Sequence, residues 1–275
     1  MSALRPLVVA LLLVGTPFAV FAGQGPRIIT SPVEARGLEG VGRLDFAGGA
    51  GFCTAALVSP THVLTAAHCV FDSRSGSPMR PEELTFRAGL RFGREEARRR
   101  VRRLAVHPDY RYDDDALRHS VNADLALLEL DRALNLPNVL PFKAEGRLDR
   151  GDTVQVVSYA KEREHAPAIE DDCVVLDRYR RILTLSCQIN FGSSGAPVFA
   201  RTSDGLQLVS VISAMGVDED AGLAFAVTLG RNGLSDLIAE LQRSPSLPPV
   251  RKTLRFDGSD RSEGAPDSTI RFLRP

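Results

Sequence analysis

The sequence has no excess of charge of either sign, because 34 basic side chains balance 34 acidic ones over 275 residues. Long-range attraction to nucleic acid or to an anionic membrane therefore has no basis in the composition, and neither is expected as a partner. Lysine is scarce, and arginine carries almost all of the positive charge. With 44% apolar and 25% charged residues, the composition is that of an ordinary folded protein and excludes a disordered or collagen-like chain.

Long apolar runs are absent after residue 22, so no later segment is expected to span a membrane. Before that point, Arg5 precedes an apolar stretch that ends at Ala22. A lone positive charge followed by an apolar run and a small residue is the pattern of a signal peptide, so cleavage is expected after Ala22. A membrane anchor is the alternative, but Gly-Thr-Pro at residues 15–17 interrupts the run. We therefore expect a secreted or periplasmic protein.

Cysteine is rare, and none of the four cysteines belongs to a Cys-x-x-Cys motif. In an exported protein they are expected to form disulfides. Of the three possible pairings, Cys53 with Cys69 and Cys173 with Cys187 are favoured, because the partners lie on neighbouring expected elements. Zinc is the alternative, but two isolated pairs without the usual spacing make a poor tetrahedral site, so no metal is expected.

Short apolar, β-branched segments separated by turns fill the middle of the chain and indicate strands. They form two groups, divided by a polar stretch at residues 135–152, and only residues 234–242 have a strong helical pattern, with Leu234, Leu237, Ile238 and Leu241 on one face. The expected strands cover residues 41–46, 52–58, 63–65, 84–88, 101–106 and 125–130, then 154–159, 173–176, 182–186, 197–199, 206–213 and 223–227. This order predicts an all-β protein of two antiparallel barrels or sandwiches.

The chain from residue 243 onward is rich in Pro, Ser, Gly and Asp, which indicates a linker and a flexible tail. A docking segment is the alternative, because a few apolar residues such as Phe256 and Phe272 remain there. The expected organisation is a signal peptide at 1–22, a first barrel at 23–134, a second barrel with the helix at 135–242, and a tail at 243–275.

Three short strings contain the groups of nucleophilic catalysis. They are Thr-Ala-Ala-His-Cys ending at Cys69, Asp-Leu-Ala-Leu-Leu beginning at Asp124, and Gly-Ser-Ser-Gly-Ala-Pro beginning at Gly192. A serine hydroxyl needs a histidine to accept its proton, and that imidazole needs a carboxylate to fix its tautomer. Each string alone has an ordinary structural explanation; together they favour a catalytic set.

The three strings and their order resemble those of the chymotrypsin-like (trypsin-like) serine proteases over residues 28–242. The first two strings match the family motifs fully, and the serine string matches at four of six places. The resemblance implies two six-stranded antiparallel barrels with the active site in the cleft between them. It also implies Ser194 as nucleophile, His68 as general base, Asp124 as its orienting carboxylate, and the amides of Gly192 and Ser194 as oxyanion hole. The second cysteine pair is similar to that of bacterial secreted members.

The family resemblance places the substrate pocket just before the nucleophile and along a later strand. The residues at those places are Gln188, Ile189, Ser213, Ala214, Met215 and Gly216. No carboxylate occurs there, so a small or uncharged substrate side chain is expected. The resemblance implies an endopeptidase that acts on peptides through an acyl-enzyme. We also expect a monomer that needs no cofactor. A catalytically inactive homologue that binds a partner is the alternative, because Ser193 and Ala196 depart from the motif.

Ser193 has a further consequence under the resemblance, because the digestive relatives have an aspartate at this position. That aspartate pairs with a newly cut N-terminal ammonium and orders the oxyanion hole. A serine cannot supply the charge, so insertion of Ile28 after cleavage at Arg27 is not expected. We therefore expect an enzyme without a zymogen switch, with its oxyanion hole ordered by local contacts.

Other candidate residues have ordinary interpretations. His62, His107, His119 and His165 are expected to be exposed, and the Asp113–Asp115 run to be a solvated loop. The cluster of Arg98, Arg99, Arg100, Arg102 and Arg103 is interpreted as a solvated strand edge, with a patch for an anionic partner as the alternative.

Overall fold

A computed structural model describes residues 25–49, 51–112, 121–217, 222–230 and 233–244. The expected signal peptide at 1–22, most of the tail at 243–275, the Asp113–Asp115 run and His119 lie outside the described residues.

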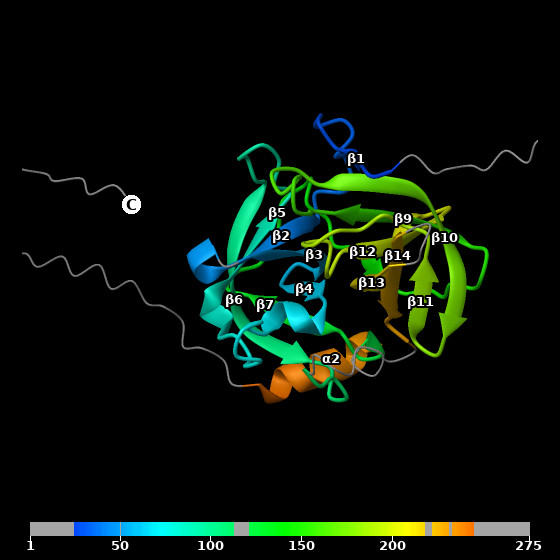
Figure 1. The fold of residues 1–275 in the computed structure, drawn as a ribbon. Helices are drawn as coiled ribbons and strands as arrows, with labels where there is room; N and C mark the ends of the chain where they lie inside the picture. Colours follow the sequence, from blue (N-terminus) through cyan, green and yellow to red (C-terminus); the bar gives the residue numbers. More distant parts are fainter. Residues whose placement is uncertain (1–24, 50, 113–120, 218–221, 231–232, 245–275) are drawn as a thin grey trace, which may run out of the picture.

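The first group of strands closes into an antiparallel barrel (Figure 1). The ring consists of β2 (Val41–Phe46), β3 (Phe52–Ser59), β4 (His62–Thr65), β7 (Ala126–Leu130), β6 (Ala97–Val106) and β5 (Leu84–Ala88), in that order. Period-two alternation places one face of each strand inside: in β5, Leu84, Phe86 and Ala88 are buried while the two residues between them are partly exposed.

The second group closes in the same way, because β9 pairs with both β10 and β12. The ring is β9 (Thr153–Ser158), β10 (Ala168–Tyr179), β11 (Ile182–Leu185), β14 (Gly222–Thr228), β13 (Gly205–Val217) and β12 (Pro197–Thr202). Two short strands join it from outside: β1 (Arg27–Ile28) pairs with β10, and β8 (Lys143–Ala144) runs parallel to β13. The predicted all-β architecture of two six-stranded barrels is confirmed.

One α-helix, α2 (Gly233–Arg243), follows the second barrel but packs on β6 and β7 of the first. Leu237 and Leu241 are buried beneath it, as the helical pattern predicts. Ile238, on the same apolar face, is 38% exposed and lies at the margin of the buried stripe. Three short 3₁₀ helices complete the described elements: η1 (Ala47–Gly49), η2 (Ala67–Val70) and η3 (Pro81–Glu83).

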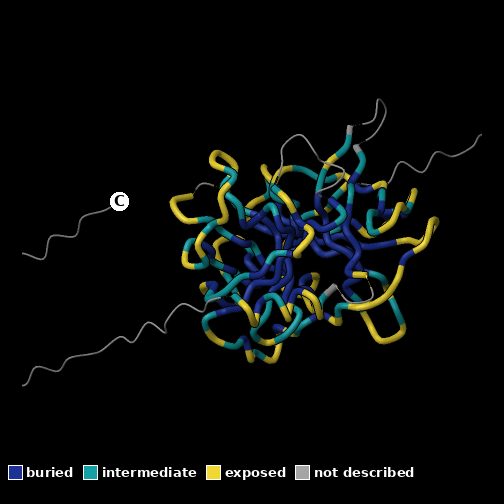
Figure 2. The backbone as a smooth tube through the Cα atoms, turned by 90° about the horizontal axis from the view of Figure 1, so that it is seen from below, coloured by how far each residue is buried: buried dark blue, intermediate teal, exposed yellow. Residues whose placement is uncertain are grey.

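Buried side chains fill both barrels and continue across the junction between them, where the rings of Phe142 and Phe199 lie 4.6 Å apart. Figure 2 shows buried segments in the interior and exposed segments at loops around it. Both predicted disulfides are present: Cys53–Cys69 joins β3 to η2, and Cys173–Cys187 joins β10 to the loop after β11. In the described part of the chain, no helix has the length and apolar character needed to cross a membrane.

The sequence pattern located all twelve barrel strands, but it missed β1 and β8, which have only two residues each. It also started β6 at residue 101, whereas the strand begins at Ala97. The arginines between these positions form regular pairs with β5, so the cluster lies within a closed barrel and the expected strand edge is wrong.

Candidate active site

His68 and Asp124 are brought together by the pairing of β4 with β7. The pairing sets Thr65 opposite Ala126, so the residues that follow β4 and those that precede β7 lie at the same end of the barrel. His68 lies in η2, directly after β4. Its Nδ1 is 2.8 Å from Oδ2 of Asp124, and its main-chain N–H donates to Oδ1 at 2.9 Å. The carboxylate therefore fixes both the backbone and the imidazole of His68.

Asp124 is only 3% exposed and receives a third hydrogen bond from the hydroxyl of Ser213, on β13 of the second barrel. A buried carboxylate needs such donors, because each replaces part of its lost hydration. Ser213 was expected to line the substrate pocket, and sequence reasoning missed its bond to Asp124. No local signal could have revealed it, because the two residues are 89 positions apart.

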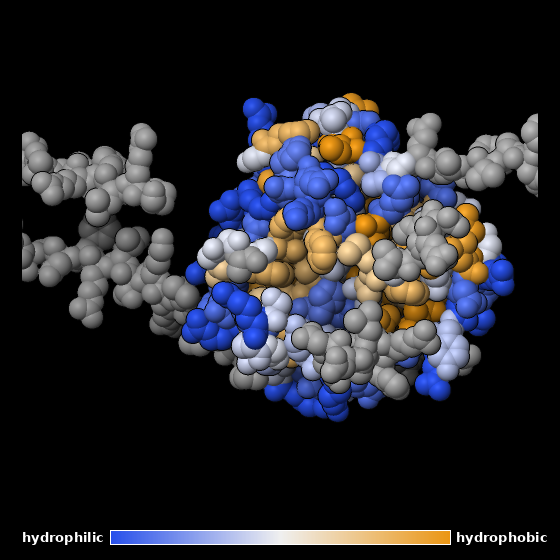
Figure 3. Space-filling model, viewed as in Figure 1, coloured by the Kyte–Doolittle hydropathy of each residue, from blue (hydrophilic) through white to orange (hydrophobic). Residues whose placement is uncertain are grey.

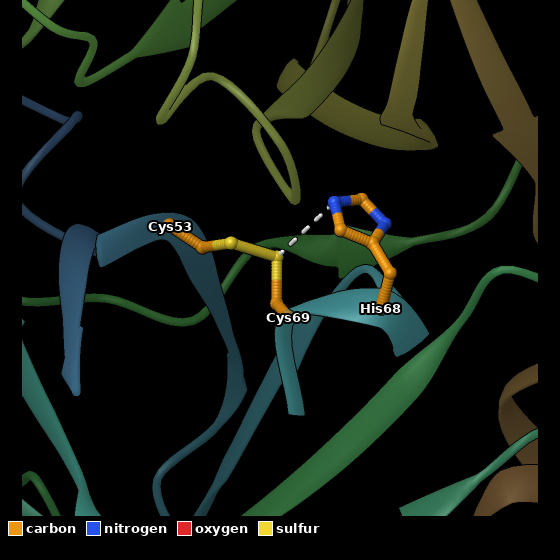
Figure 4. A group of neighbouring side chains, drawn as sticks. All are labelled: Cys53, His68 and Cys69. Atoms are coloured by element: carbon orange, nitrogen blue, oxygen red, sulfur yellow. Dashed lines mark hydrogen bonds between the residues drawn. A yellow bond between two sulfur atoms is a disulfide. The ribbon is translucent and has the colours of Figure 1, made fainter. Parts of the chain in front are cut away.

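Burial and the neighbouring carboxylate shift the pKa of His68 in opposite directions. Burial by itself lowers its pKa, but the negative charge of Asp124 and the hydrogen bond to it raise the pKa, and the net shift is upward. The imidazole leaves Nε2 free of Asp124; this nitrogen lies 3.8 Å from Sγ of Cys69 in the Cys53–Cys69 disulfide (Figure 4). Nδ1 is thus occupied by the carboxylate, while Nε2 remains available for proton transfer.

Ser194 lies in the turn between β11 and β12, pressed against the first barrel. A Cβ atom on Gly195 would lie 2.1 Å from Thr65 Oγ1 and 2.2 Å from the carbonyl oxygen of Thr54, and its φ is +79°. Only glycine allows both this backbone conformation and this approach. The carbonyl of Ser194 then accepts the main-chain N–H of Thr54 at 2.8 Å. The string around Ser194 is therefore shaped to dock this turn beside His68.

Thr54 is the centre of this docking, and it is fully buried. Its hydroxyl donates to the carbonyl of Gly192 at 2.9 Å and accepts the main-chain N–H of Tyr159 at 3.0 Å. One side chain of the first barrel thus holds two loops of the second.

The amides of Gly192 and Ser194 donate to no other protein group within the described residues. Free amides beside a nucleophile are what an oxyanion hole requires. The Ser194 hydroxyl likewise makes no hydrogen bond to His68 or to any other described residue. Its neighbour Ser193 is instead fully buried and bonded.

A cavity of about 720 Å³ contains His68 and Ser194 in its wall. Its lining combines large apolar side chains with polar groups: Phe46, Phe52, Phe71, Met79, Tyr112, Ile189, Phe191 and Met215 on the one hand, and Asp72, Ser73, Arg74, Asn190 and Ser213 on the other. Figure 3 shows apolar surface at the middle of the molecular face, between the two barrels. A space of this size can take several residues of a polypeptide, and its apolar members offer contacts to uncharged side chains.

The expected pocket residues divide between two places. Ile189, Ser213, Ala214 and Met215 line the main cavity, as do Gly192 and Ser194. Gln188 is exposed and lines a separate cavity of about 410 Å³ beside β1, where its side chain lies against Gly25. Gly216 packs against the ring of Phe225 and is absent from both linings. The structure therefore does not place Gln188, expected at the base of the pocket, or Gly216, expected in its wall, in the lining of the main cavity.

The remaining candidates have structural partners. His107 is 5% exposed rather than solvated, because its Nε2 lies 2.8 Å from the guanidinium of Arg181; the expectation of exposure is wrong for this residue. His62 is half-buried beside Ser59 and Thr61, and His165 is exposed. On β6, Arg102 and Arg103 both pair with Glu129. The sulfurs near His68 and near Glu170 belong to disulfides and offer no thiolate to a metal.

Comparison with known proteins adds independent information. Residues 49–206 match the family model of the trypsin-like peptidase domain. A segment of 94 residues is 36% identical to the complement C1r subcomponent-like protein of Mus musculus; it covers 31% of this chain and only 18% of that relative. A solved structure of Glu endopeptidase in complex with MPD superposes with a TM-score of 0.61 at 14% identity, covering 79% of this chain and 97% of that one. At this identity the structural likeness concerns the fold.

Proposed function

Because the chain belongs to the trypsin-like peptidase family, and is thus a serine-type endopeptidase acting on peptides, we propose that His68, Asp124 and Ser194 form its catalytic triad. The observation that carries the proposal is the carboxylate of Asp124, which binds both Nδ1 and the main-chain N–H of His68. This arrangement holds the imidazole with Nε2 free, in the same cavity wall as Ser194. In a histidine with a purely structural role, there is no reason for Nε2 to stay accessible in the same cavity wall as a serine hydroxyl.

In the proposed reaction, Ser194 Oγ attacks the carbonyl carbon of the scissile peptide while Nε2 of His68 takes the hydroxyl proton. The resulting imidazolium returns this proton to the departing amine, and the acyl group stays on Ser194. Water then attacks the ester through the same base, and the carboxylic acid product leaves. The Ser194 hydroxyl must turn toward Nε2 for the first step, and such bonds commonly tighten only when substrate binds.

The amides of Gly192 and Ser194 are proposed to bind the negative oxygen that develops during both attacks. Their freedom from other acceptors supports this role. The carbonyl of Phe191, which shares a peptide plane with the Gly192 N–H, is held by the Lys161 N–H at 2.7 Å, and the carbonyl of Ser193, which shares a plane with the Ser194 N–H, is held by the Ala196 N–H at 2.9 Å. An oxyanion donor of this kind typically contributes about 10²- to 10³-fold in rate.

The substrate side chain that enters the cavity is proposed to be uncharged. Ile189 and Met215 line the cavity where a charged substrate would need a carboxylate or a guanidinium. The charged members of the lining, Asp72 and Arg74, lie on the loop after η2. Hydrolysis of a peptide library should favour uncharged residues before the cleaved bond; a strong preference for lysine, arginine or glutamate would contradict the proposal.

The proposed setting is outside the cytoplasm, after removal of residues 1–22. Two disulfides support it, because such bonds persist in oxidising compartments. The mature enzyme is proposed to act as a monomer, with the organisation into barrels at 23–134 and 135–242 and a tail at 243–275.

Covalent labelling with a fluorophosphonate probe tests the triad. The probe should attach to the parent protein at Ser194, which peptide mass mapping identifies, and the Ser194→Ala variant should take up none. Ser203→Ala is the matched control, because Ser203 lies in the exposed β12–β13 hairpin away from the cavity, and it should label like the parent. A folded parent that takes up no label would contradict the proposal and favour an inactive homologue.

A further inference from the structure

A half-buried arginine lies behind the turn that carries Ser194, and the catalytic chemistry does not use it. Arg163 belongs to the loop between β9 and β10. Its Nη1 donates to the carbonyl oxygen of Ser158 at 2.8 Å and to the Ser158 hydroxyl at 3.2 Å. Ser158 is 3% exposed, so the guanidinium reaches inward from the surface into the second barrel.

The Ser158 hydroxyl connects this cation to the nucleophile turn. It accepts a second hydrogen bond from the hydroxyl of Ser193, at 3.3 Å. Since Arg163 can only donate, it occupies one lone pair of Ser158 Oγ and leaves the other for Ser193. The hydroxyl proton of Ser193 is thereby directed away from its own turn, and the Ser193 oxygen is left as an acceptor.

That acceptor closes the turn. The main-chain N–H of Asn190 lies 3.4 Å from Ser193 Oγ, and the main-chain N–H of Ser193 donates to the carbonyl of Asn190 at 2.9 Å. The two bonds link the ends of residues 190–193 reciprocally. Gly192 lies inside this closed turn and Ser194 directly follows it, so the two free amides take their directions from it.

A second contact anchors the approach to the turn. Both carboxylate oxygens of Glu170 lie within hydrogen-bond distance of the Gln188 main-chain N–H, at 3.1 and 3.0 Å. Glu170 is buried beside the Cys173–Cys187 disulfide and interacts electrostatically with Arg163. The Arg163 loop also bonds directly to the turn, because Lys161 N–H donates to the carbonyl of Phe191 at 2.7 Å.

We propose that Arg163 is a positioning residue for the oxyanion hole: through Ser158 and Ser193 it fixes the turn that aims the amides of Gly192 and Ser194. The cation comes from within the chain and is in place without any cleavage. This inference rests on the proposed function. Burial lowers the pKa of Arg163, but arginine keeps its charge at neutral pH, so the contact persists over the working range.

The test compares Arg163→Met, Arg163→Lys and Ser158→Ala with Arg181→Met. Arg181 is the matched control because its guanidinium is also half-buried and donates to main-chain carbonyls, those of Thr228 and Leu229. Its remaining side-chain hydrogen bond is with His107, so none of its hydrogen bonds within the described residues reaches the turn that carries Ser194. The readouts are the rate constant of fluorophosphonate labelling, whose phosphoryl oxygen enters the oxyanion hole, and kcat and KM on a peptide, all measured where each variant is folded.

We expect Arg163→Met and Ser158→Ala to lower the labelling rate and kcat about tenfold or more, with KM nearly unchanged, since the lost interaction acts on the transition state. Arg163→Lys should recover most of the loss, and Arg181→Met should label like the parent. The inference is overturned, and the proposed function is not, if Arg163→Met and Ser158→Ala label at the parent's rate. It is overturned in the same way if their labelling rate constants fall no further than that of Arg181→Met. If the folded parent protein does not react with the probe at all, the proposed function is contradicted, and this inference is contradicted with it.

Discussion

Replacement of Thr54 by valine tests how strongly the two barrels depend on one hydroxyl. Valine keeps the shape of threonine but can neither donate nor accept a hydrogen bond. The substitution leaves two groups without their partner at a fully buried position: the Tyr159 main-chain N–H and the Gly192 carbonyl. The loop contacts of the second barrel are otherwise untouched.

The magnitude follows from these two groups. A buried polar group left without a partner costs about 1–3 kcal/mol, so the free energy of unfolding should fall by about 2–6 kcal/mol. For a protein of this size, 1 kcal/mol shifts Tm by about 2–4 °C, so Tm should fall by at least about 4 °C. Since Gly192 loses an anchor, kcat should fall as well while KM changes less.

Urea unfolding of the parent, Thr54→Val, Thr54→Ser and Thr228→Val measures the effect. Thr228 is the matched control, because its hydroxyl is buried without a hydrogen-bond partner among the described residues. Thr228→Val should be neutral or stabilising, and Thr54→Ser should retain most of the stability because it keeps the hydroxyl. Equal unfolding midpoints for Thr54→Val and Thr228→Val would refute the reasoning.

The remaining predictions concern catalysis, pH and activation. His68→Ala should lower kcat by several orders of magnitude without loss of circular dichroism signal, and a variant of near-parent activity would exclude His68 as the base. Because Asp124 raises the pKa of His68, kcat/KM should rise with pH through a midpoint above the ordinary histidine value; a flat profile would contradict the assignment. Burial raises the pKa of Glu170 to about 7, so its contribution to stability is fully present below its ordinary pKa of 4.5 and is lost as pH rises through 7. As the pH rises from about 5 to 8, the urea midpoint of unfolding should therefore fall less for Glu170→Gln than for the parent. If the two plots of midpoint against pH run parallel, Glu170 does not titrate in this way. Arg27→Gln, expressed from residue 23 with extra residues ahead of it, should be fully active, whereas activity that appears only after cutting behind residue 27 would reveal a zymogen.

Local sequence patterns predicted most of the fold because barrel strands alternate with period two and end at turns. The twelve barrel strands and the helix were found this way, and their bounds differ mainly where charged residues hide the alternation, as at Arg98 and Arg99 on β6. The two-residue strand β1 carries no pattern, because its existence depends on the edge that β10 presents.

The sequence predicted those residues of the candidate site that lie in recognisable motifs. His68, Asp124 and Ser194 lie in short strings whose composition reflects their local geometry. Ser213 and Arg163 act on distant residues through bonds that depend on the closure of two barrels, and neither position has a distinctive neighbourhood in sequence. Gln188 was misplaced for the same reason: its main-chain N–H is bound by Glu170, and its side chain lines the cavity beside β1.

The position of α2 makes the first barrel depend on a segment that follows the second barrel in the chain. This helix covers β6 and β7, although it is the last element that the structure describes, and the whole second barrel is made before it. The barrel that supplies His68 and Asp124 therefore keeps an uncovered apolar face until the segment up to residue 243 has folded onto it. Neither half of the chain made alone should reach this state, because the first half lacks its cover and the second half ends in a helix without a surface to pack on. The stability of the first barrel, and with it any activity, therefore depends on the chain being intact through residue 243.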